Sequence, residues 1–330
     1  MDYKSDYIWS DGELIPYEEA TIHILTSSLH YGFGAFEGIR AYATDKGPAV
    51  FRLRDHFERF LNSARVLGVR DFPFSVEELR EATHEVIHAN KFQSCYIRPL
   101  LHFVGSFALN LDQTEPHVSI STWEWGTYLG EGNLEKGVHM GVSSFTRHHT
   151  NVNMTKAKIT GNYANSILAK TDAVRNGFDE AIMLDPEGYV AECTGENIFL
   201  VENGNIYTPP KAAILGGITR DSLMTLADDL GYQVVEEKIS RDQLYIADEI
   251  FACGTAAEVT PVTRVDHRPV GNGKRGSVTE DIQELFFKTV EGRGKRSSEW
   301  LDCNGYVNSE EDDLLALKSV PRQKQGLAMK

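Results

Sequence analysis

Residues 154–163 constrain this chain more than any other stretch, because two lysines stand there among small, hydroxyl and aromatic residues. Apolar residues then recur at three- and four-residue spacing until Asn176-Gly177, a pattern that predicts a helix beginning near Tyr163. An amine held at such a helix entrance would lose hydration, and its pKa would fall until it could attack a carbonyl compound. Composition alone favours two solvated loop lysines. Nothing in the local sequence separates Lys156 from Lys158.

The composition is that of a globular protein that handles small molecules. The chain has 330 residues, of which 41% are hydrophobic and 25% charged, enough for two domains with cores of their own. Its formal charge of -15 opposes non-specific binding to nucleic acid or to an anionic membrane. The beginning of the chain shows no export signal and no run is long enough to span a bilayer, so we expect a cytoplasmic protein.

The cysteines indicate neither a disulfide framework nor a metal site. They lie far apart in the sequence and form no Cys-x-x-Cys pair, so reduced thiols are the simplest interpretation. The cysteines in question are Cys95, Cys193, Cys253 and Cys303.

The first third of the chain shows alternating strand and helix signals. Asp11-Gly12 between two apolar runs predicts a β-hairpin. Residues 29–40 hold three glycines among aromatic residues, which is typical of a tightly packed strand and turn. Residues 55–68 and 75–89 have the apolar spacing of helices. Arg59 projects from the face opposite the apolar stripe of the first of these helices, where an arginine is ordinarily solvated.

Strand alternation over residues 95–101 puts Tyr96 and Arg98 on one face. A phenol beside a guanidinium can bind a carboxylate, because the guanidinium offers a fork of donors. A surface ion pair would give the same pattern. Residues 118–123 predict a further strand, and the glycine-rich residues 125–133 that follow show little periodicity, so we place a domain boundary there.

Residues 214–220, which include two glycines, lead into another predicted helix, which carries Leu223, Leu226, Ala227 and Leu230 and stops at Gly231. Free amide N–H groups at a helix start, next to the positive end of the helix dipole, can bind a phosphate, although many such turns bind nothing. Residues 249–252 predict an apolar strand that leads into Gly254-Thr255. A threonine at the end of a strand is more often a cap than a ligand.

The segment from Lys158 to Tyr163, Lys-Ile-Thr-Gly-Asn-Tyr, resembles the Schiff-base lysine segment of the branched-chain-amino-acid aminotransferases. These enzymes belong to the class IV, D-amino-acid-aminotransferase-like group of pyridoxal phosphate enzymes. Other segments resemble the same family in the expected order, namely residues 31–38, 96–99, 192–199, 215–219 and 254–258. One of them departs from the pattern: the family's usual Leu-Pro-Gly-Ile-Thr reads Leu-Gly-Gly-Ile-Thr here, which loosens the turn at Gly216. The resemblance covers about residues 7–301.

The resemblance implies pyridoxal 5'-phosphate as the cofactor, no metal, and Lys158 as the catalytic residue that holds the cofactor and moves the proton. The cofactor-binding residues that it implies are Arg59, Lys158, Tyr163, Glu192, Leu215, Ile218, Thr219 and Thr255. The substrate-binding residues that it implies are Tyr31, Phe36, Gly38, Tyr96, Arg98, Trp125, Tyr128, Thr255 and Ala256.

A second hairpin is predicted over residues 180–192, because two apolar runs flank a turn that contains proline and glycine. Glu192 and Glu196 follow at its exit. A carboxylate there could keep the pyridine nitrogen of the cofactor protonated, which lets the ring accept electrons. Either residue could serve, and the family pattern favours Glu192. Solvent exposure is the ordinary state of both side chains, and Glu196 could satisfy local backbone instead.

The expected fold is α/β (α+β), in the two-domain arrangement of fold type IV pyridoxal phosphate enzymes. We expect a small N-terminal domain over residues 1–122, an interdomain linker over 123–135 and a large domain with the lysine over 136–303. Residues 304–330 form an appended polar tail. Three leucines in this tail could form a short docking helix, although its composition favours partial disorder: Leu314, Leu315 and Leu317.

The function that the resemblance implies is transfer of an amino group between leucine, isoleucine or valine and 2-oxoglutarate, in a homodimer or higher oligomer. Residues 105–111 would then reach the pocket of a neighbouring subunit. Within the same fold the alternatives are a D-amino-acid transaminase, an (R)-selective amine transaminase and an aminodeoxychorismate lyase. A non-catalytic, pyridoxal-phosphate-binding regulatory oligomer is the alternative of another class. It would hold the cofactor and transfer no amino group.

Overall fold

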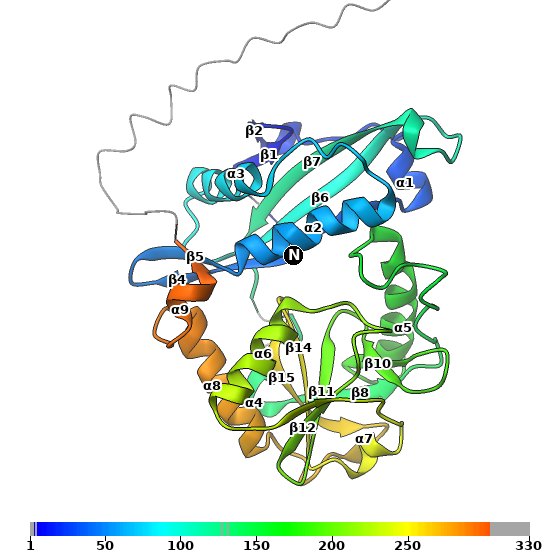
Figure 1. Cartoon of the computed structure of the whole chain (residues 1–330), viewed down its shortest axis with the longest axis vertical. Helices are drawn as coiled ribbons and strands as arrows, with labels where there is room; N and C mark the ends of the chain where they lie inside the picture. Colours follow the sequence, from blue (N-terminus) through cyan, green and yellow to red (C-terminus); the bar gives the residue numbers. More distant parts are fainter. Residues whose placement is uncertain (1–2, 4, 127, 131, 304–330) are drawn as a thin grey trace, which may run out of the picture.

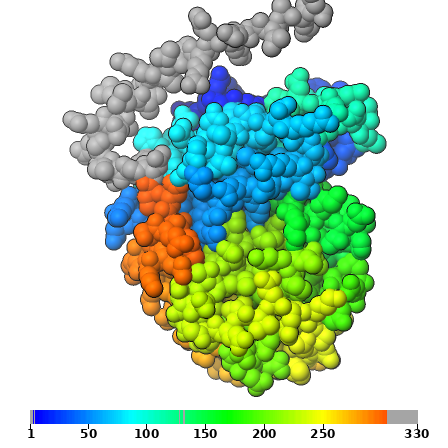
Figure 2. All heavy atoms as spheres, in the orientation of Figure 1, coloured from blue at the N-terminus to red at the C-terminus, as the bar shows by residue number. Residues whose placement is uncertain are grey.

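The computed structural model describes residues 3, 5–126, 128–130 and 132–303, so the predictions for the tail lie outside the described residues. Two β-sheets with their covering helices form two parts that meet along a seam (Figure 1). The space-filling view shows the part coloured blue to cyan resting on the part coloured green to orange (Figure 2). The prediction of a mixed α/β (α+β) architecture is confirmed.

The first sheet contains the strands of residues 7–123 together with β17 from the end of the described chain, and all its pairings are antiparallel. Its order is β17-β5-β4-β6-β7-β1-β2, and β3 pairs with β6. The predicted hairpin at Asp11-Gly12 is present, since β1 pairs with β2 across that turn. The strands are β1 (Tyr7–Ser10), β2 (Glu13–Pro16), β3 (Gly34–Phe36), β4 (Ile39–Thr44), β5 (Gly47–Phe51), β6 (Cys95–Gly105), β7 (Thr114–Trp123) and β17 (Leu301–Asp302).

The helices of this first part are close to the predicted ones. α2 begins at Leu53, two residues before the predicted start, and ends at Leu67 before a left-handed Gly68. α3 (Val76–Ala89) begins with a capping box, in which Ser75 and Glu78 satisfy each other's backbone N–H groups. The apolar stripes of both helices pack on the sheet and build one core. The short helices here are α1 (Ser27–Tyr31), η1 (Tyr17–Glu19) and η2 (Leu111–Gln113).

The second sheet is mixed and has the order β10-β9-β8-β15-β14-β11-β12-β13, with β16 on β15. The predicted hairpin over residues 180–192 is present as the antiparallel pair β9 and β10. The strands are β8 (Val138–Val142), β9 (Glu180–Leu184), β10 (Val190–Cys193), β11 (Asn197–Glu202), β12 (Asn205–Thr208), β13 (Val234–Glu236), β14 (Glu249–Gly254), β15 (Glu258–Val265) and β16 (Arg268–Pro269).

Helices cover the second sheet, and two of them frame the seam. α5 (Tyr163–Arg175) follows a single 3-10 turn, η3 (Thr160–Asn162), so the predicted helix start at Tyr163 is confirmed. The predicted helix before Gly231 is present as α6 (Ile218–Asp229). The remaining helices are α4 (Asn133–Lys136), α7 (Gln243–Ile246), α8 (Ser277–Val290) and α9 (Ser297–Trp300).

The two parts share hydrophobic contacts at the seam. Phe51, from β5 of the first sheet, packs edge to face on Phe286 of α8 and on Trp300 of α9. Directly after Trp300 the chain forms β17, which adds to the edge of the first sheet beside β5. The end of the described chain therefore returns to the first sheet, whereas the sequence leads us to expect residues 136–303 in the large domain.

The described residues contain no helix long and apolar enough to cross a membrane. They also contain no group of three or more histidine, cysteine, aspartate or glutamate side chains that could hold a metal ion. The predicted reduced state of the four cysteines agrees with the structure, in which all of them are free thiols.

Candidate active site

A cavity of about 740 Å³, including its opening to solvent, lies at the seam between the two parts. Its walls come from β6, α2 and the turn before β4 in the first part, and from the lysine segment, α6 and the ends of β10 and β14 in the second. The structure brings together there these residues with predicted roles: Gly38, Arg59, Tyr96, Lys158, Tyr163, Glu192, Leu215, Ile218, Thr219, Thr255 and Ala256.

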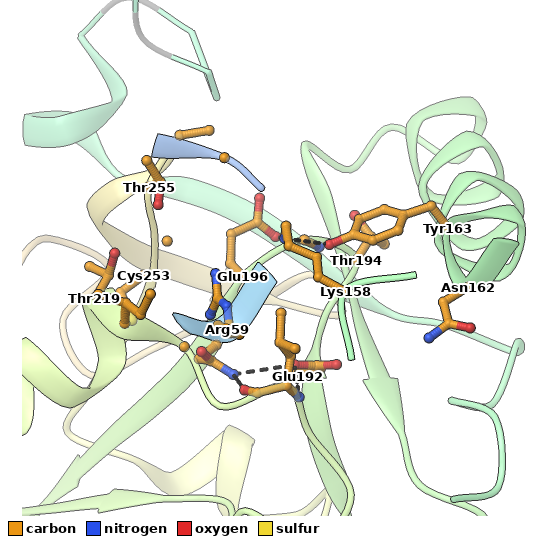
Figure 3. A pocket seen from close by; sticks show the side chains of 18 of the residues that line it. Arg59, Lys158, Asn162, Tyr163, Glu192, Thr194, Glu196, Thr219, Cys253 and Thr255 are labelled. Atoms are coloured by element: carbon orange, nitrogen blue, oxygen red, sulfur yellow. Dashed lines mark hydrogen bonds between the residues drawn. The ribbon is translucent and has the colours of Figure 1, made fainter. Parts of the chain in front are cut away.

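Lys158 extends into this cavity, as Figure 3 shows. Its Nζ donates a hydrogen bond to the hydroxyl of Tyr163 at 2.7 Å and lies 4.9 Å from the ring centre of Phe36. Its backbone is fixed to the first part of the molecule: the Lys158 amide donates to Ser63 Oγ at 2.9 Å, and its carbonyl accepts from the Phe36 amide at 3.0 Å. The amine is therefore held between the two parts.

Lys156 differs from Lys158 in the position of its side chain. Its side chain is exposed and outside the cavity, and its Nζ donates to the Ile214 carbonyl at 3.2 Å. Partial burial lowers its pKa. The ambiguity between the two lysines is thus removed by their positions, because only Lys158 can reach a molecule in the cavity.

Glu192 is buried at the floor of the cavity, so the ordinary expectation of an exposed side chain is wrong here. Its Oε1 lies 2.6 Å from Arg147 Nη2, and its Oε2 accepts from the Leu215 amide and from Asn197 Nδ2, both at 3.2 Å. Burial raises the pKa of Glu192, although Arg147 and the Leu215 amide oppose that effect. Three contacts therefore fix the orientation of this carboxyl group.

Glu196 is buried too, so its expected exposure is also wrong, and its side chain lines the same cavity. Its carboxylate accepts a hydrogen bond from the Gly195 amide at 3.1 Å, which confirms the expected contact with local backbone. Burial and the nearby Glu180 raise the pKa of Glu196 to about 8.

The other end of the cavity offers hydrogen-bond donors to an anion. α6 has Gly217 as its N-cap, with no side-chain cap among the described residues, so the amide N–H groups of Ile218 and Thr219, which line the cavity, are available to an anion. A Cβ at Gly217 would stand 1.9 Å from Asn197 Oδ1, so the turn requires glycine. We call the start of α6, with the amides of Ile218 and Thr219, the anion seat. Thr255 lies near it, as Figure 3 shows.

Arg59 reaches this seat from α2, and its interpretation as a solvated surface arginine is wrong. Only 15% of its side chain is exposed, because Nε and Nη2 bind the buried Glu37 and Nη1 donates to the Gly216 carbonyl at 2.8 Å. The apolar stripe correctly places Arg59 on the far side of α2. That side faces the second part of the molecule instead of solvent.

The predicted substrate side is partly assembled around Tyr96. Gly38 packs so closely on this ring that a Cβ there would stand 2.1 Å from the Tyr96 hydroxyl. Arg98 lies on the same face, with Nη2 3.2 Å from that hydroxyl and its guanidinium carbon 4.6 Å from the Phe36 ring centre. Its Nε is buried and has no partner among the described residues. The prediction that Tyr96 and Arg98 share a face is confirmed.

Five predicted substrate residues do not line the cavity, and they fall into two groups. Phe36, Arg98 and Trp125 lie directly behind lining residues: the ring centre of Trp125 is 4.5 Å from that of Tyr96, the ring centre of Phe36 is 4.8 Å from that of Tyr163, and Arg98 packs on the Phe36 ring. Tyr31 and Tyr128 are exposed. Tyr31 lines a separate apolar hollow beside the loop of residues 105–111.

Several lining residues were not predicted from the sequence, Arg147 above all. It comes from the loop after β8, where neither periodicity nor a motif singles it out. Glu37 does not line the cavity but binds Arg59, and the family segment Phe-Glu-Gly that contains it is the sequence signal that could reveal it. The other cavity residues without a predicted role are Ala157, Asn162, Thr194, Gly195, Asn197, Gly217, Cys253 and Gly254.

These groups line one cavity and offer three kinds of chemistry. The start of α6 offers donors to an anion, Lys158 offers an amine, and Glu192 offers a buried carboxyl group. An aromatic ring that carries a phosphate, a basic ring nitrogen and a carbonyl group can use all three. The residues present therefore fit pyridoxal 5'-phosphate.

Known proteins resemble this chain over most of its length. The branched-chain-amino-acid aminotransferase of Pseudomonas aeruginosa is 50% identical over 302 residues, which is 91% of this chain and 98% of the relative. That of Escherichia coli K12 is 45% identical over 305 residues, with 91% and 97% covered.

Solved structures agree with the sequence relatives. The branched-chain aminotransferase of Thermoproteus uzoniensis with norvaline superposes with a TM-score of 0.86 at 43% identity, covering 91% of this chain and 99% of the other. That of Thermobaculum terrenum in its PLP-form gives a TM-score of 0.85 at 34% identity, with the same coverage. The family model for class IV amino-transferases matches residues 34–265, which include the lysine, the carboxyl groups and the anion seat. By its fold, its sequence and the residues that line its cavity, this chain belongs to the class IV aminotransferases.

Proposed function

We propose that the protein is a pyridoxal-phosphate-dependent transaminase that exchanges an amino group between branched-chain L-amino acids and 2-oxoglutarate. The observation that carries the proposal is that Lys158, the carboxyl group of Glu192 and the start of α6 line one cavity. The names of the relatives at 44 to 50% identity support the branched-chain substrate class.

Pyridoxal 5'-phosphate, when bound, supplies an aldehyde for the amino group and a protonated ring that draws electrons from the substrate Cα. Arg59, Thr255 and the amides of Ile218 and Thr219 would hold its phosphate, and Leu215 would pack on the ring. Glu192 would face the ring nitrogen, where its negative charge favours the protonated form. The contacts of Glu192 with Arg147 and the Leu215 amide would keep it in that position.

Lys158 is the base that would take the proton from the substrate Cα and return it to the cofactor, because it is the amine that reaches the cavity. Tyr163 holds Nζ by a hydrogen bond of 2.7 Å, and the Phe36 ring limits its movement from another side. The fixed backbone of Lys158 completes this orientation. Reacting groups held in this way avoid the entropy cost of finding each other.

The substrate would lie between the amine and the first sheet. Tyr96, Gly38 and Phe36 offer an apolar surface to an aliphatic side chain, and the amides at Thr255 and Ala256 offer donors to the α-carboxylate. Arg98 has a buried Nε without a partner among the described residues and could bind the second carboxylate of glutamate or 2-oxoglutarate. One pocket would thus accept both substrate types.

We also infer a homodimer or higher oligomer in the cytoplasm. Exposed apolar side chains gather on two segments that touch, since the Tyr31 hydroxyl donates to the Phe107 carbonyl at 3.2 Å. Such a surface supports burial against a second copy. The side chains are Ile22, Ile24, Leu25, Leu29, Tyr31, Phe107 and Leu109. Light scattering should give at least twice the chain mass, and a fully active monomer would contradict this part.

An absorbance experiment tests the function directly. The purified protein is loaded with pyridoxal 5'-phosphate, and its spectrum is recorded before and after L-leucine and then 2-oxoglutarate. The bound cofactor should give an absorbance band in the violet region. This band should disappear with leucine and return with 2-oxoglutarate, which reports both half-reactions. If leucine left the band unchanged and a D-amino acid or an (R)-amine removed it, the substrate would be reassigned to that compound class. A band that no donor changes would favour a regulatory binding protein.

A further inference from the structure

Glu37 is completely buried, and its carboxylate is bound by two basic side chains of α2. It stands between β3 and β4, beside the predicted pocket residues Phe36 and Gly38. Its Oε1 accepts from Arg59 Nε and its Oε2 from Arg59 Nη2, both at 2.8 Å, and Oε2 also lies 2.8 Å from His56 Nδ1. Burial would raise its pKa, but Arg59 and His56 hold that pKa well below its ordinary value.

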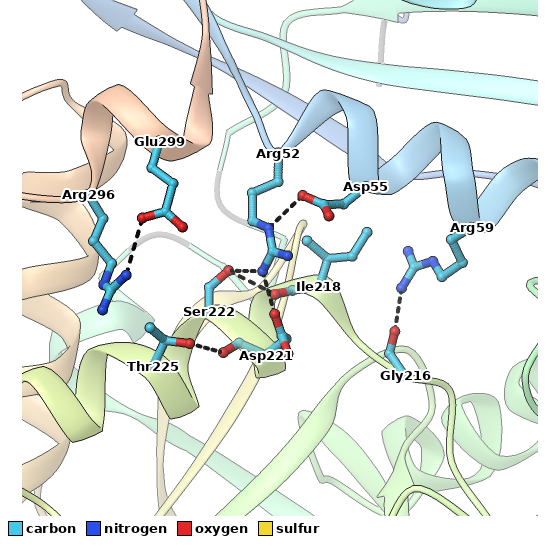
Figure 4. Close-up of polar contacts among 10 residues, drawn as sticks. All are labelled: Arg52, Asp55, Arg59, Gly216, Ile218, Asp221, Ser222, Thr225, Arg296 and Glu299. Carbon is cyan, nitrogen blue, oxygen red and sulfur yellow. Dashed lines mark hydrogen bonds and ion pairs between the residues drawn. The ribbon is translucent and has the colours of Figure 1, made fainter. Parts of the chain in front are cut away.

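This fork of two bonds uses one edge of the Arg59 guanidinium. Nη1 donates to the Gly216 carbonyl at 2.8 Å, so three of the five N–H groups are bound to the protein. The remaining two lie on Nη1 and Nη2, in a side chain that lines the cavity. Figure 4 shows Arg59 reaching from α2 to Gly216, directly before the start of α6.

Arg52, the N-cap residue of α2, makes the same crossing independently. Arg52 Nη1 lies 2.6 Å from Asp221 Oδ2 and 3.0 Å from Ser222 Oγ, both in the first turns of α6 (Figure 4). The position of α2 relative to the anion seat is therefore set by Arg52 as well. The additional role of Glu37 is to fix the orientation of the Arg59 guanidinium, which could otherwise rotate about its side-chain bonds.

We infer that Glu37 is a positioning residue, whose carboxylate fixes the Arg59 guanidinium so that its two remaining N–H groups serve the phosphate of the cofactor. This inference rests on the proposed function, since it takes the α6 end as the phosphate seat. A planar guanidinium recognises a phosphate by directed donors, so its orientation matters as much as its charge.

Charge and orientation give opposite expectations for the removal of Glu37. Its negative charge lies next to Arg59 and opposes an anion, so an effect of charge alone would make phosphate binding tighter in Glu37→Gln. The glutamine NH2 group would meet an arginine donor, and the fork would be lost, so an effect of orientation makes phosphate binding weaker. Glu37→Asp separates the two effects, because it keeps the charge and withdraws the fork by one methylene group.

The experiment compares pyridoxal 5'-phosphate with pyridoxal, which lacks the phosphate. Dissociation constants for both are measured by protein fluorescence on the full-length chain after removal of bound cofactor. The dissociation constant of pyridoxal divided by that of pyridoxal 5'-phosphate reports how much the phosphate contributes to binding. Glu37→Gln and Glu37→Asp should each reduce this ratio about tenfold, the effect expected for hydrogen bonds to a charged group. Glu236→Gln is the matched control, because Glu236 pairs with Arg220 of α6 and lies outside the cavity.

A double-mutant comparison identifies the route of the effect. Once Arg59→Met has removed the guanidinium, adding Glu37→Gln should leave the ratio unchanged. A further fall would mean that Glu37 does not act through Arg59 and would overturn the inference. Equal weakening of both ligands by Glu37→Gln would indicate a structural role and would overturn it too, as would a tighter phosphate contribution. If the unmodified protein itself showed no preference for the phosphate, the proposed function would fail first.

Discussion

The Nζ of Lys158 and the hydroxyl of Tyr163 lie 2.7 Å apart across the entrance of α5. The 3-10 turn of residues 160–162 makes this approach possible, because it folds the lysine segment back over the first residue of the helix. One short segment thus supplies both the amine and the group that orients it.

Replacing Lys158 by alanine should abolish transamination, because no other amine lines the cavity among the described residues. The loss should be about 10⁴-fold or more, since one residue serves in covalent and in acid-base steps. Glutamate formed from leucine and 2-oxoglutarate measures the rate. Lys156→Ala is the control and should keep most of the activity. Substantial turnover by the Lys158 variant would refute the assignment.

Tyr163→Phe should slow turnover about tenfold, the effect of one hydrogen bond that orients a reacting group. The ring contact with Phe36 at 4.8 Å remains in this variant, so the pocket shape is kept. The measurement is kcat with saturating leucine, together with circular dichroism to show that α5 is intact. An unchanged kcat would mean that the hydroxyl does not control the position of the amine.

The helices and hairpins of this fold were predictable because they depend on near neighbours. The spacing of apolar residues after Tyr163 and the stop at Asn176-Gly177 suffice to define α5, which ends at Arg175. The turn at Asp11-Gly12 likewise defines its hairpin. The family motifs then selected Lys158 over Lys156, which the local pattern alone could not do.

The environment of the site was less predictable, because it depends on residues far apart in the chain. The burial of Glu192 follows from its pairing with Arg147, which stands on another strand connection. The burial of Arg59 follows from Glu37 and from contact with the second part of the molecule. Periodicity reports which face of a helix is apolar, but it does not report what covers the polar face.

The Glu192–Arg147 pair should contribute strongly to stability, because under 10% of either side chain is exposed. Glu192→Gln leaves the Arg147 guanidinium buried without a counter-charge, and it should reduce the free energy of unfolding by about 3 kcal/mol. Urea unfolding of the cofactor-free chain measures this difference. Adding Arg147→Met should recover part of the loss, since the unpaired charge is removed.

An exposed ion pair provides the contrast for that experiment. Lys238 and Glu187 pair on the surface, where water screens their attraction. Glu187→Gln should leave the urea midpoint unchanged. If Glu192→Gln behaved in the same way, the carboxyl group would not be a buried partner of Arg147.

Arg98 should discriminate between the two substrate types. Arg98→Met keeps an apolar side chain against the Phe36 ring, where the guanidinium carbon now lies at 4.6 Å. The KM for 2-oxoglutarate should rise about 100-fold, because a charge-assisted pair with the distal carboxylate is lost. The half-reaction with leucine, followed by the cofactor spectrum, should change only a few-fold. An equal loss for both substrates would assign Arg98 to the α-carboxylate or to structure.

Glu196 carries a pH dependence into the fold. Its pKa in the folded protein is raised to about 8, by burial first and by Glu180 second. The carboxylate of Glu180 accepts hydrogen bonds from Lys170 Nζ and Thr194 Oγ1, both at 2.6 Å. Among the described residues it makes no hydrogen bond with Glu196. The folded protein therefore keeps a proton on Glu196 that the unfolded chain releases above its ordinary pKa of 4.5.

This difference makes the contribution of Glu196 to stability fall as the pH rises from 4.5 to about 8, after which it is constant. Glu196→Gln cannot lose a proton, so the variant should gain stability relative to the unmodified protein across the same interval, by about 5 kcal/mol. Urea unfolding of both proteins at pH 5, 7 and 9 measures the gain, and other titrating groups cancel because both proteins share them. A difference that stays constant from pH 5 to pH 9 would show that Glu196 ionises normally in the cavity.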